Sequence, residues 1–173
     1  MKYRGIGIFM LSLQIFTDGS VNTESKVGYG AFLLIQDINS SVESLKDKVR
    51  LKRFEQTSST KLELQTFLWA LEETIASANG DKIVITAYTD SQNIIGLPGR
   101  RQRLEQNNYF SAKNKRLSNY ELYQEFYQLT SQINCNFIKV SGHQPSGEKD
   151  KIAKIFSLVD RASRGALRED LCI

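Results

Sequence analysis

The sequence predicts an α/β fold in a single domain over residues 1–173, built on a mixed five-stranded sheet of three antiparallel strands plus two parallel strands, with helices on both faces. The chain opens with three strand-like segments separated by turn-rich stretches, and strand-like and helix-like segments then alternate to its end. Its 173 residues, 40% of them hydrophobic, supply one core but not two comfortable ones.

The three antiparallel strands are expected at residues 11–17, 27–36 and 47–55, where apolar or alternating residues are separated by the turn-rich stretches DGSVNTES and DINSSVESL. Residues 60–78 then change to helical spacing, with a single apolar stripe and a Ser/Thr cap at the start. This change of period places the first long helix directly after the third strand.

The second half of the chain predicts parallel strands linked by helices. A strand at 82–89 ends at Asp90, where a short helix begins, and Pro98-Gly99 stops that helix. After an irregular basic segment, the sequence predicts a helix at 119–132, a strand at 135–141 and a final helix at 149–168.

The composition limits where the protein works. Lys2 and Arg4 precede an apolar run, as in a signal peptide, but no small-residue cleavage site follows, and cleavage would remove the strand that carries Asp18. The run is also shorter than the ~20 residues of a membrane span. Cys135 and Cys172 form neither a metal-binding spacing nor a disulfide framework. We therefore expect a soluble, cytoplasmic monomer with no membrane partner, whose net charge of +4 permits a polyanionic one.

Three acidic residues follow or begin predicted elements: Asp18, Glu63 and Asp90. Each has a structural alternative, because Asp18 can start a turn, Thr60 and Glu63 have capping-box spacing, and Asp90 can cap a helix. Together they predict a shared site, because this strand order places the first and fourth strands side by side, with the first long helix packed across them. Converging carboxylates repel one another unless a divalent cation holds them, and oxygen ligands favour Mg²⁺ or Mn²⁺.

The final helix and the segment before it add two candidates. Asp160 falls about 40° from Phe156 around the helix, within the apolar stripe, so we expect it to face the protein body and to need a metal or another partner. Asp150 is the rival, although it points off the stripe and can cap the helix. His143, the only histidine, follows the fifth strand and has a pKa suited to proton transfer.

Six segments in this order resemble type 1 ribonuclease H over about residues 11–168: FTDGS, VGYGAFLL, SSTKLELQTFLWALEE, YTDSQ, VSGH and VDRASR. The resemblance implies a ribonuclease H-like fold and an endonuclease that cuts the RNA strand of RNA–DNA hybrids with two Mg²⁺ ions. It also implies 5′-phosphate and 3′-hydroxyl products. By motif, the metal-binding catalytic carboxylates are Asp18, Glu63, Asp90 and Asp160, and His143 is the histidine of the flexible loop.

The sequence departs from the family pattern at two places. His143 and Asp160 lie further apart than is usual, which keeps Asp150 open as the fourth carboxylate. The turn after Asp18 is shortened and lacks a Gly/Pro-rich run, so Asn22 is the nearest counterpart of the family's substrate-contacting asparagine.

Candidate substrate contacts lie in two further segments. The position of the basic segment 98–117 corresponds to the basic protrusion with which many family members grip the hybrid, although such a segment is a solvated loop in most proteins. Its cations are Arg100, Arg101, Arg103, Lys113, Lys115 and Arg116. Ser58 and Ser59, before the first long helix, resemble the family's substrate-facing polar pair and can also cap that helix.

Two other functions remain open at the sequence level. One is another nuclease or strand-transferase of the same superfamily, such as a junction resolvase or an integrase. The other is a catalytically inactive nucleic-acid-binding module. The glutamate after a three-strand meander disfavours the first, and acids at all four motif positions disfavour the second.

Overall fold

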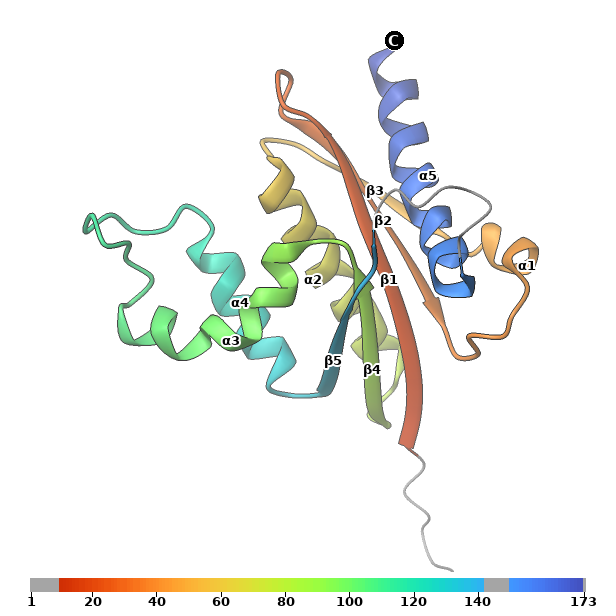
Figure 1. Cartoon of the computed structure of the whole chain (residues 1–173), viewed down its shortest axis with the longest axis horizontal. Helices are drawn as coiled ribbons and strands as arrows, with labels where there is room; N and C mark the ends of the chain where they lie inside the picture. The colour runs from red at the N-terminus through yellow and green to blue at the C-terminus, as the bar shows by residue number, and fades with distance from the viewer. Residues whose placement is uncertain (1–9, 142–149, 173) are drawn as a thin grey trace, which may run out of the picture.

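The five strands form one sheet in the order β3-β2-β1-β4-β5, with the long strand β1 at its centre (Figure 1). The computed structural model describes residues 10–141 and 150–172. The strands are β1 (Met10–Asn22), β2 (Val27–Ile35), β3 (Arg50–Phe54), β4 (Lys82–Thr89) and β5 (Asn134–Lys139). β1, β2 and β3 pair antiparallel, whereas β4 runs parallel to β1, and β5 parallel to β4. The predicted mixed sheet is confirmed.

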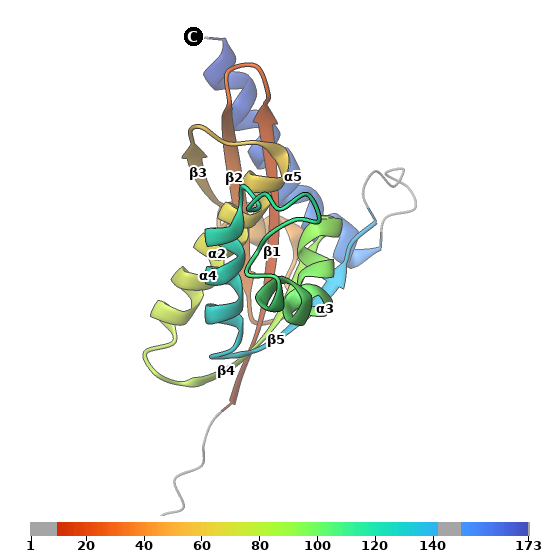
Figure 2. The same cartoon turned by 90° about the vertical axis from the view of Figure 1, so that its left-hand side faces the viewer.

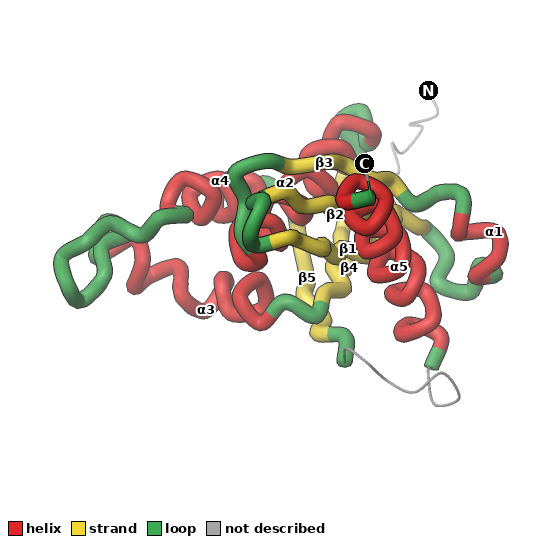
Figure 3. The backbone as a smooth tube through the Cα atoms, turned by 90° about the horizontal axis from the view of Figure 1, so that it is seen from above, coloured by secondary structure: helices red, strands yellow, loops and turns green. Residues whose placement is uncertain are grey.

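Helices cover both faces of this sheet (Figure 3). The helices are α1 (Val42–Lys46), α2 (Ser59–Ser77), α3 (Gln92–Gln106), α4 (Tyr120–Thr130) and α5 (Lys151–Leu171). Because side chains alternate along a strand, Leu13 and Ile15 of β1 join the core under α2, α3 and α4, while Phe16 joins the core under α1 and α5. α2, α3 and α4 lie together on one face, and α5 lies on the other (Figure 2).

β1 continues through Asp18 to Asn22, so the prediction that this strand ends at residue 17 was wrong. The extra residues stay in the sheet because β2 continues to pair with them, as far as Asn22 opposite Val27. Glycines in both strands let α2 lie close to this part of the hairpin. A Cβ atom at Gly28, for example, would lie 2.7 Å from Cδ2 of Leu62.

The segment before β3 holds a short helix that the sequence pattern did not predict. α1 begins after Ser41, whose side chain accepts a hydrogen bond from the backbone N–H of Ser44, and Leu45 is buried against the α5 side of the sheet. β3 is consequently shorter than the predicted strand at 47–55. A helix of five residues is too short to show a clear 3.6-residue period, so tertiary packing of one leucine decides it.

α3 continues past Pro98, so the prediction that Pro98-Gly99 stops it was wrong. A proline removes one helical N–H and disturbs the preceding turn. Here side chains satisfy carbonyls of that turn: the Arg100 guanidinium donates to the carbonyl oxygens of Asn93 (2.8 Å) and Gly96 (3.3 Å). The Tyr127 hydroxyl of α4 donates to the carbonyl of Leu97 at 2.7 Å. The basic segment 98–117, predicted to be irregular, is therefore helical in its first part, as far as Gln106.

The remaining predicted elements are present with small shifts at their ends. The predicted ranges 60–78, 119–132, 135–141 and 149–168 correspond to α2, α4, β5 and α5, whose observed ends differ from them by one to three residues. Across the two described stretches of the chain, no helix is long and apolar enough to cross a membrane.

Candidate active site

Asp18 and Asp90 meet because of the register between the two central strands. The last parallel pair between β1 and β4 is Phe16 with Tyr88, whose rings stack at a centroid distance of 4.5 Å. Each aspartate stands two residues beyond its member of this pair. Since side chains alternate along an extended chain, both are expected on the face that carries Phe16, which is the face that α5 covers. The predicted neighbourhood of these two acids is observed.

The carboxyl group of Asp18 is the most perturbed acid in this region. Burial above all, together with repulsion from Asp90 and Asp160, raises its pKa from an ordinary 3.8 to about 8. Asp18 also forms a hydrogen bond with Asp160, and only the backbone N–H of Gly19 works in the opposite direction. Three carboxyl groups from β1, the end of β4 and α5 therefore interact at one place.

Glu63 reaches the same place from the other face of the sheet. The hydroxyl of Ser91, the residue after Asp90, donates a hydrogen bond to the Glu63 carboxylate. Burial raises the pKa of Glu63 first of all; the bond from Ser91 lowers it and the charge of Asp90 raises it. Ser91 thus links the first turns of α2 to the Asp90 side of the cluster.

The capping alternatives for two of the acids are contradicted. The N-cap of α2 is Ser58, whose side chain accepts from the N–H of Lys61 at 3.4 Å, so Thr60 and Glu63 do not form a capping box. The N-cap of α3 is Ser91, whose hydroxyl accepts from the N–H of Ile94 at 3.2 Å. Neither Glu63 nor Asp90 is therefore the N-cap of its helix.

The two rivals on the last helix have different surroundings. Asp160 is 26% exposed and forms an ion pair with Nε of Arg164, one turn later, at 2.8 Å. Asp150 is exposed and caps α5, accepting from the N–H of Ala153 at 2.8 Å. Asp160 interacts with Asp18. Asp150 instead caps the helix, which was the structural role predicted from the sequence as the alternative to metal binding. The geometry favours Asp160 as the fourth carboxylate.

The cluster is not a ready-made metal cage. Within residues 10–141 and 150–172, no three His, Cys, Asp or Glu side chains are arranged to hold one ion together. The partners explain this, because Arg164 holds Asp160 and Ser91 holds Glu63. The donor chemistry nevertheless fits a hard divalent cation, since every candidate is a carboxylate, and burial followed by repulsion from Asp90 and Asp160 raises the pKa of Asp18.

The polar candidates for substrate contact lie near the same end of the sheet. Asn22 is the last residue of β1, and its side chain accepts from the N–H groups of Glu24 and Ser25 at 3.0 and 2.9 Å. Ser58 caps α2 and Ser59 begins it; both are exposed. His143 lies outside the described residues.

The six cations of the basic segment differ in their partners. Arg100 bonds to its own helix, Arg101 pairs with Glu105 at 2.8 Å, and Arg116 lies over the ring of Tyr120 at 4.1 Å. Arg103, Lys113 and Lys115 are exposed and have no ion pair among the described residues. Segment 98–117 extends from the second half of α3 to the loop before α4, and it projects away from the sheet (Figure 1).

The sequence patterns missed two residues at this site, Ser91 and Arg164. Ser91 has a recognisable signal, because a serine after a strand and before a helix is a preferred N-cap. Arg164 has one too, since it stands four residues after Asp160, the spacing at which helical ion pairs form.

A mixed sheet in this order, with carboxylates gathered at the ends of its two central neighbours, defines a nuclease of the ribonuclease H-like class. The chain belongs to the ribonuclease H family: the family model described as RNase H matches residues 11–157. It is accordingly a ribonuclease H enzyme. The matched region includes Asp18, Glu63 and Asp90 and ends before Asp160.

Related proteins agree with this family. A protein named ribonuclease H from Chlorobium luteolum is 26% identical over 134 residues, which is 76% of this chain and 83% of the relative. Among solved structures, LC9-RNase H1, a type 1 RNase H with the type 2 active-site motif, aligns with a TM-score of 0.66 at 15% identity over 92% of this chain and 73% of its own.

Two further structures share the fold. The N-terminal RNase H domain of a Mycobacterium tuberculosis protein, solved as a fusion with maltose-binding protein, aligns with a TM-score of 0.60 at 14% identity over 92% of this chain and 99% of that one. A foamy viral protease-reverse transcriptase in complex with dsDNA aligns with a TM-score of 0.56 at 8% identity over 89% and 94% of the two chains. At these identities the likeness shows the fold alone.

Proposed function

We propose that this ribonuclease H is an endonuclease that hydrolyses the RNA strand of RNA–DNA hybrids with two divalent ions, Mg²⁺ or Mn²⁺, and leaves 5′-phosphate and 3′-hydroxyl ends. The observation that carries the proposal is the meeting of Asp18, Asp90 and Asp160, with Glu63 beside Asp90, at the end of the central strands. Acidic groups in this density suit metal-assisted phosphodiester hydrolysis better than catalysis by a nucleophilic side chain.

In this proposal Asp18, Glu63, Asp90 and Asp160 hold the ions. When bound, the metal ions supply an activated water and stabilise the charge on the departing 3′ oxygen. The protein positions the ligands: the strand register fixes Asp18 and Asp90, and Ser91 orients Glu63. Burial keeps bulk water from screening the Asp18 charge, so that its carboxylate interacts strongly with a cation.

Substrate selection is assigned to the protein surface around the carboxylates. RNA is distinguished from DNA by contacts to 2′-hydroxyl groups in the minor groove, for which small polar groups such as Ser58, Ser59 and Asn22 are suited. The cations of segment 98–117 are assigned to the phosphates of the hybrid, which predicts an affinity that falls steeply with salt. His143 keeps its predicted role in proton transfer to the leaving group.

The test is cleavage of an end-labelled RNA–DNA hybrid in Mg²⁺ or Mn²⁺, beside duplex DNA and duplex RNA of the same sequence. We expect only the RNA of the hybrid to be cut. The products should carry 5′-phosphate and 3′-hydroxyl ends, and removing the 5′-phosphate should prevent a ligase from joining them. Asp18→Asn should abolish cleavage. Equal cleavage of all three substrates would remove the hybrid assignment, and hybrid binding without cleavage would favour an inactive module.

The assignment of the fourth carboxylate has its own matched pair of variants. Asp160→Asn should reduce metal-dependent cleavage by at least about a hundredfold, as loss of a charged ligand does. Asp150→Asn should leave cleavage intact, because asparagine caps a helix as well as aspartate does. The reverse pattern would transfer the role to Asp150.

A further inference from the structure

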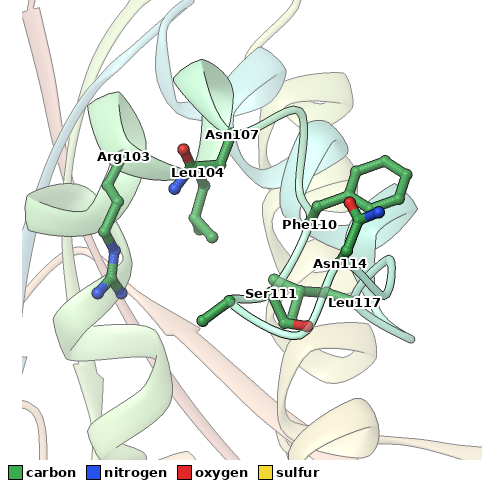
Figure 4. A pocket seen from close by; sticks show the side chains of 8 residues that line it. Arg103, Leu104, Asn107, Phe110, Ser111, Asn114 and Leu117 are labelled. Atoms are coloured by element: carbon green, nitrogen blue, oxygen red, sulfur yellow. The ribbon is translucent and has the colours of Figure 1, made fainter.

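A pocket of about 570 Å³ opens where the end of α3 meets the loop that leads to α4, and none of the four carboxylates lines it (Figure 4). It is lined mainly by Arg103, Leu104, Asn107, Phe110, Asn114 and Leu117. Figure 4 shows Arg103 and Leu104 of α3, with Asn107 just after the helix, on one side of the pocket and the loop side chains on the other. Its volume lies in the range of about 300–1,000 Å³ that is typical of small-ligand sites.

Backbone hydrogen bonds give this pocket a defined shape. The N–H of Tyr109 donates to the carbonyl of Leu104 at 2.8 Å, and the N–H of Leu117 donates to the carbonyl of Tyr109 at 2.9 Å. Phe110 and Arg116 form an isolated antiparallel bridge across the loop. Tyr109 itself is buried and anchors the loop to the core under α3 and α4. The walls are thus held by the fold.

The polar groups in the wall are exposed and pair with no other group within the described part of the chain. The guanidinium of Arg103 and the side-chain amides of Asn107 and Asn114 make no hydrogen bond or ion pair there. The neighbouring Arg100 and Arg101 are, by contrast, bonded within α3. A ligand in the pocket would therefore meet three polar side chains without breaking a bond within the protein.

The remaining surfaces of the pocket define the chemistry of that ligand. Leu104 is buried and Leu117 half-buried, which makes the floor apolar, and the ring of Phe110 is 38% exposed. The guanidinium of Arg116 lies over that ring at 5.6 Å from its centroid, and exposed Lys113 and Lys115 are on the same loop. A flat, partly apolar and anionic molecule with hydrogen-bonding edges matches this combination.

We propose that this pocket binds one unstacked nucleotide. Its base would lie against Phe110 and the leucine floor, the edge of the base would pair with the amides of Asn107 and Asn114, and its phosphate would meet Arg103. This proposal rests on the proposed action on hybrids, because it adds a site for a nucleotide beyond the paired region. The nucleotide comes either from a single strand that continues past the hybrid or from free mononucleotide in solution.

The experiment measures binding by fluorescence anisotropy in an Asp18→Asn background, which prevents cleavage. A blunt hybrid is compared with hybrids that carry single-stranded extensions of graded length at each of the four ends, and free mononucleotides are added as competitors. We expect at least one extension to tighten binding by about fivefold or more, as stacking of a base on an aromatic side chain does. Competition by free mononucleotide with no effect of extensions would instead identify the free nucleotide as the ligand.

Two variants and one control test whether the pocket is responsible. Asn107→Ala removes an amide from the wall, and Ala112→Trp fills the pocket from an exposed position. Both should abolish the preference for an extension, and the corresponding variants with Asp18 intact should cleave a blunt hybrid normally. Gln106→Ala removes an exposed amide next to the pocket and should change neither property.

Three results would overturn the inference. The first is the absence of any effect of extensions or mononucleotides. The second is a preference that survives both pocket variants, which would place the extra nucleotide elsewhere. The third is an equal loss in Gln106→Ala, which would make the effect one of general surface chemistry. Failure of the proposed function is separate, since it would appear as no cleavage of the blunt hybrid by the unaltered protein.

Discussion

Replacing Asp18 by asparagine should stabilise the metal-free protein at high pH while it abolishes cleavage. In the folded chain, burial and the charges of Asp90 and Asp160 raise the pKa of Asp18 to about 8. A group whose pKa is raised on folding favours the folded state most at low pH, below its unfolded pKa. That contribution is lost as the pH rises to the folded pKa. Above pH 8 the protein therefore carries a buried charge that asparagine does not have.

The magnitude follows from the two pKa values. A rise from 3.8 to about 8 corresponds to roughly 6 kcal/mol of lost stability at alkaline pH if the surroundings do not relax. Relaxation and water entry reduce such penalties, so we expect about 2–4 kcal/mol. For a chain of this size that is about 5–15 °C in Tm. The difference should fall by more than half between pH 9 and pH 5.

The assay is thermal or urea unfolding in EDTA at pH 5, 7 and 9, with Asp150→Asn as the matched control. Asp150 is an exposed helix cap, so its variant should follow the unaltered protein at each pH. Adding Mg²⁺ should stabilise the unaltered protein more than Asp18→Asn. An Asp18→Asn protein that is no more stable at pH 9, or whose advantage is the same at pH 5, would refute the reasoning.

Three further predictions concern the surroundings of the carboxylates. Ser91→Ala removes the donor to Glu63 and the cap of α3, so cleavage should fall about tenfold and the free energy of unfolding by about 1 kcal/mol. Ser91→Thr should keep most of the cleavage rate and most of the stability. An unchanged cleavage rate in Ser91→Ala would contradict the role of Ser91 in orienting Glu63. Arg164→Gln removes the ion-pair partner of Asp160, so calorimetry should show that Mg²⁺ binds several-fold more tightly. Weaker binding would mean that Arg164 assists metal binding. Gly30→Ala places a methyl group against α2 and should cost about 1–3 kcal/mol in urea unfolding, whereas Gly99→Ala meets no neighbouring atom and should not destabilise the protein.

The sheet and the central acids could be predicted because simple rules govern them. Strand order alone places β1 beside β4, and side-chain alternation then puts Asp18 and Asp90 on one face. The angle around a helix placed Asp160 on the inner side of α5, where it interacts with Asp18. Each of these inferences depends on backbone periodicity, which is written directly in the sequence.

The features that were missed depend on tertiary contacts instead. Helix α3 continues past Pro98, where Arg100 and Tyr127 bond to carbonyls of the preceding turn, and Tyr127 belongs to another helix. β1 passes through Asp18 because β2 continues to pair with it, although the letters DGS are typical of a turn. The catalytic roles of the site residues, including His143, are predictions, and the variants above test those of Asp18 and Asp160.

The placement of the four carboxylates along the chain has a consequence for protein synthesis. Three of them belong to the first ninety residues, whereas Asp160 lies in the last helix, which packs on β1 and β2. A nascent chain emerges from its N-terminus, so the central strands and three acids are available long before α5 can dock. The proposed metal site therefore lacks its fourth carboxylate until α5 has left the ribosome and packed on the sheet, and under the proposed mechanism we expect hydrolysis only from that moment.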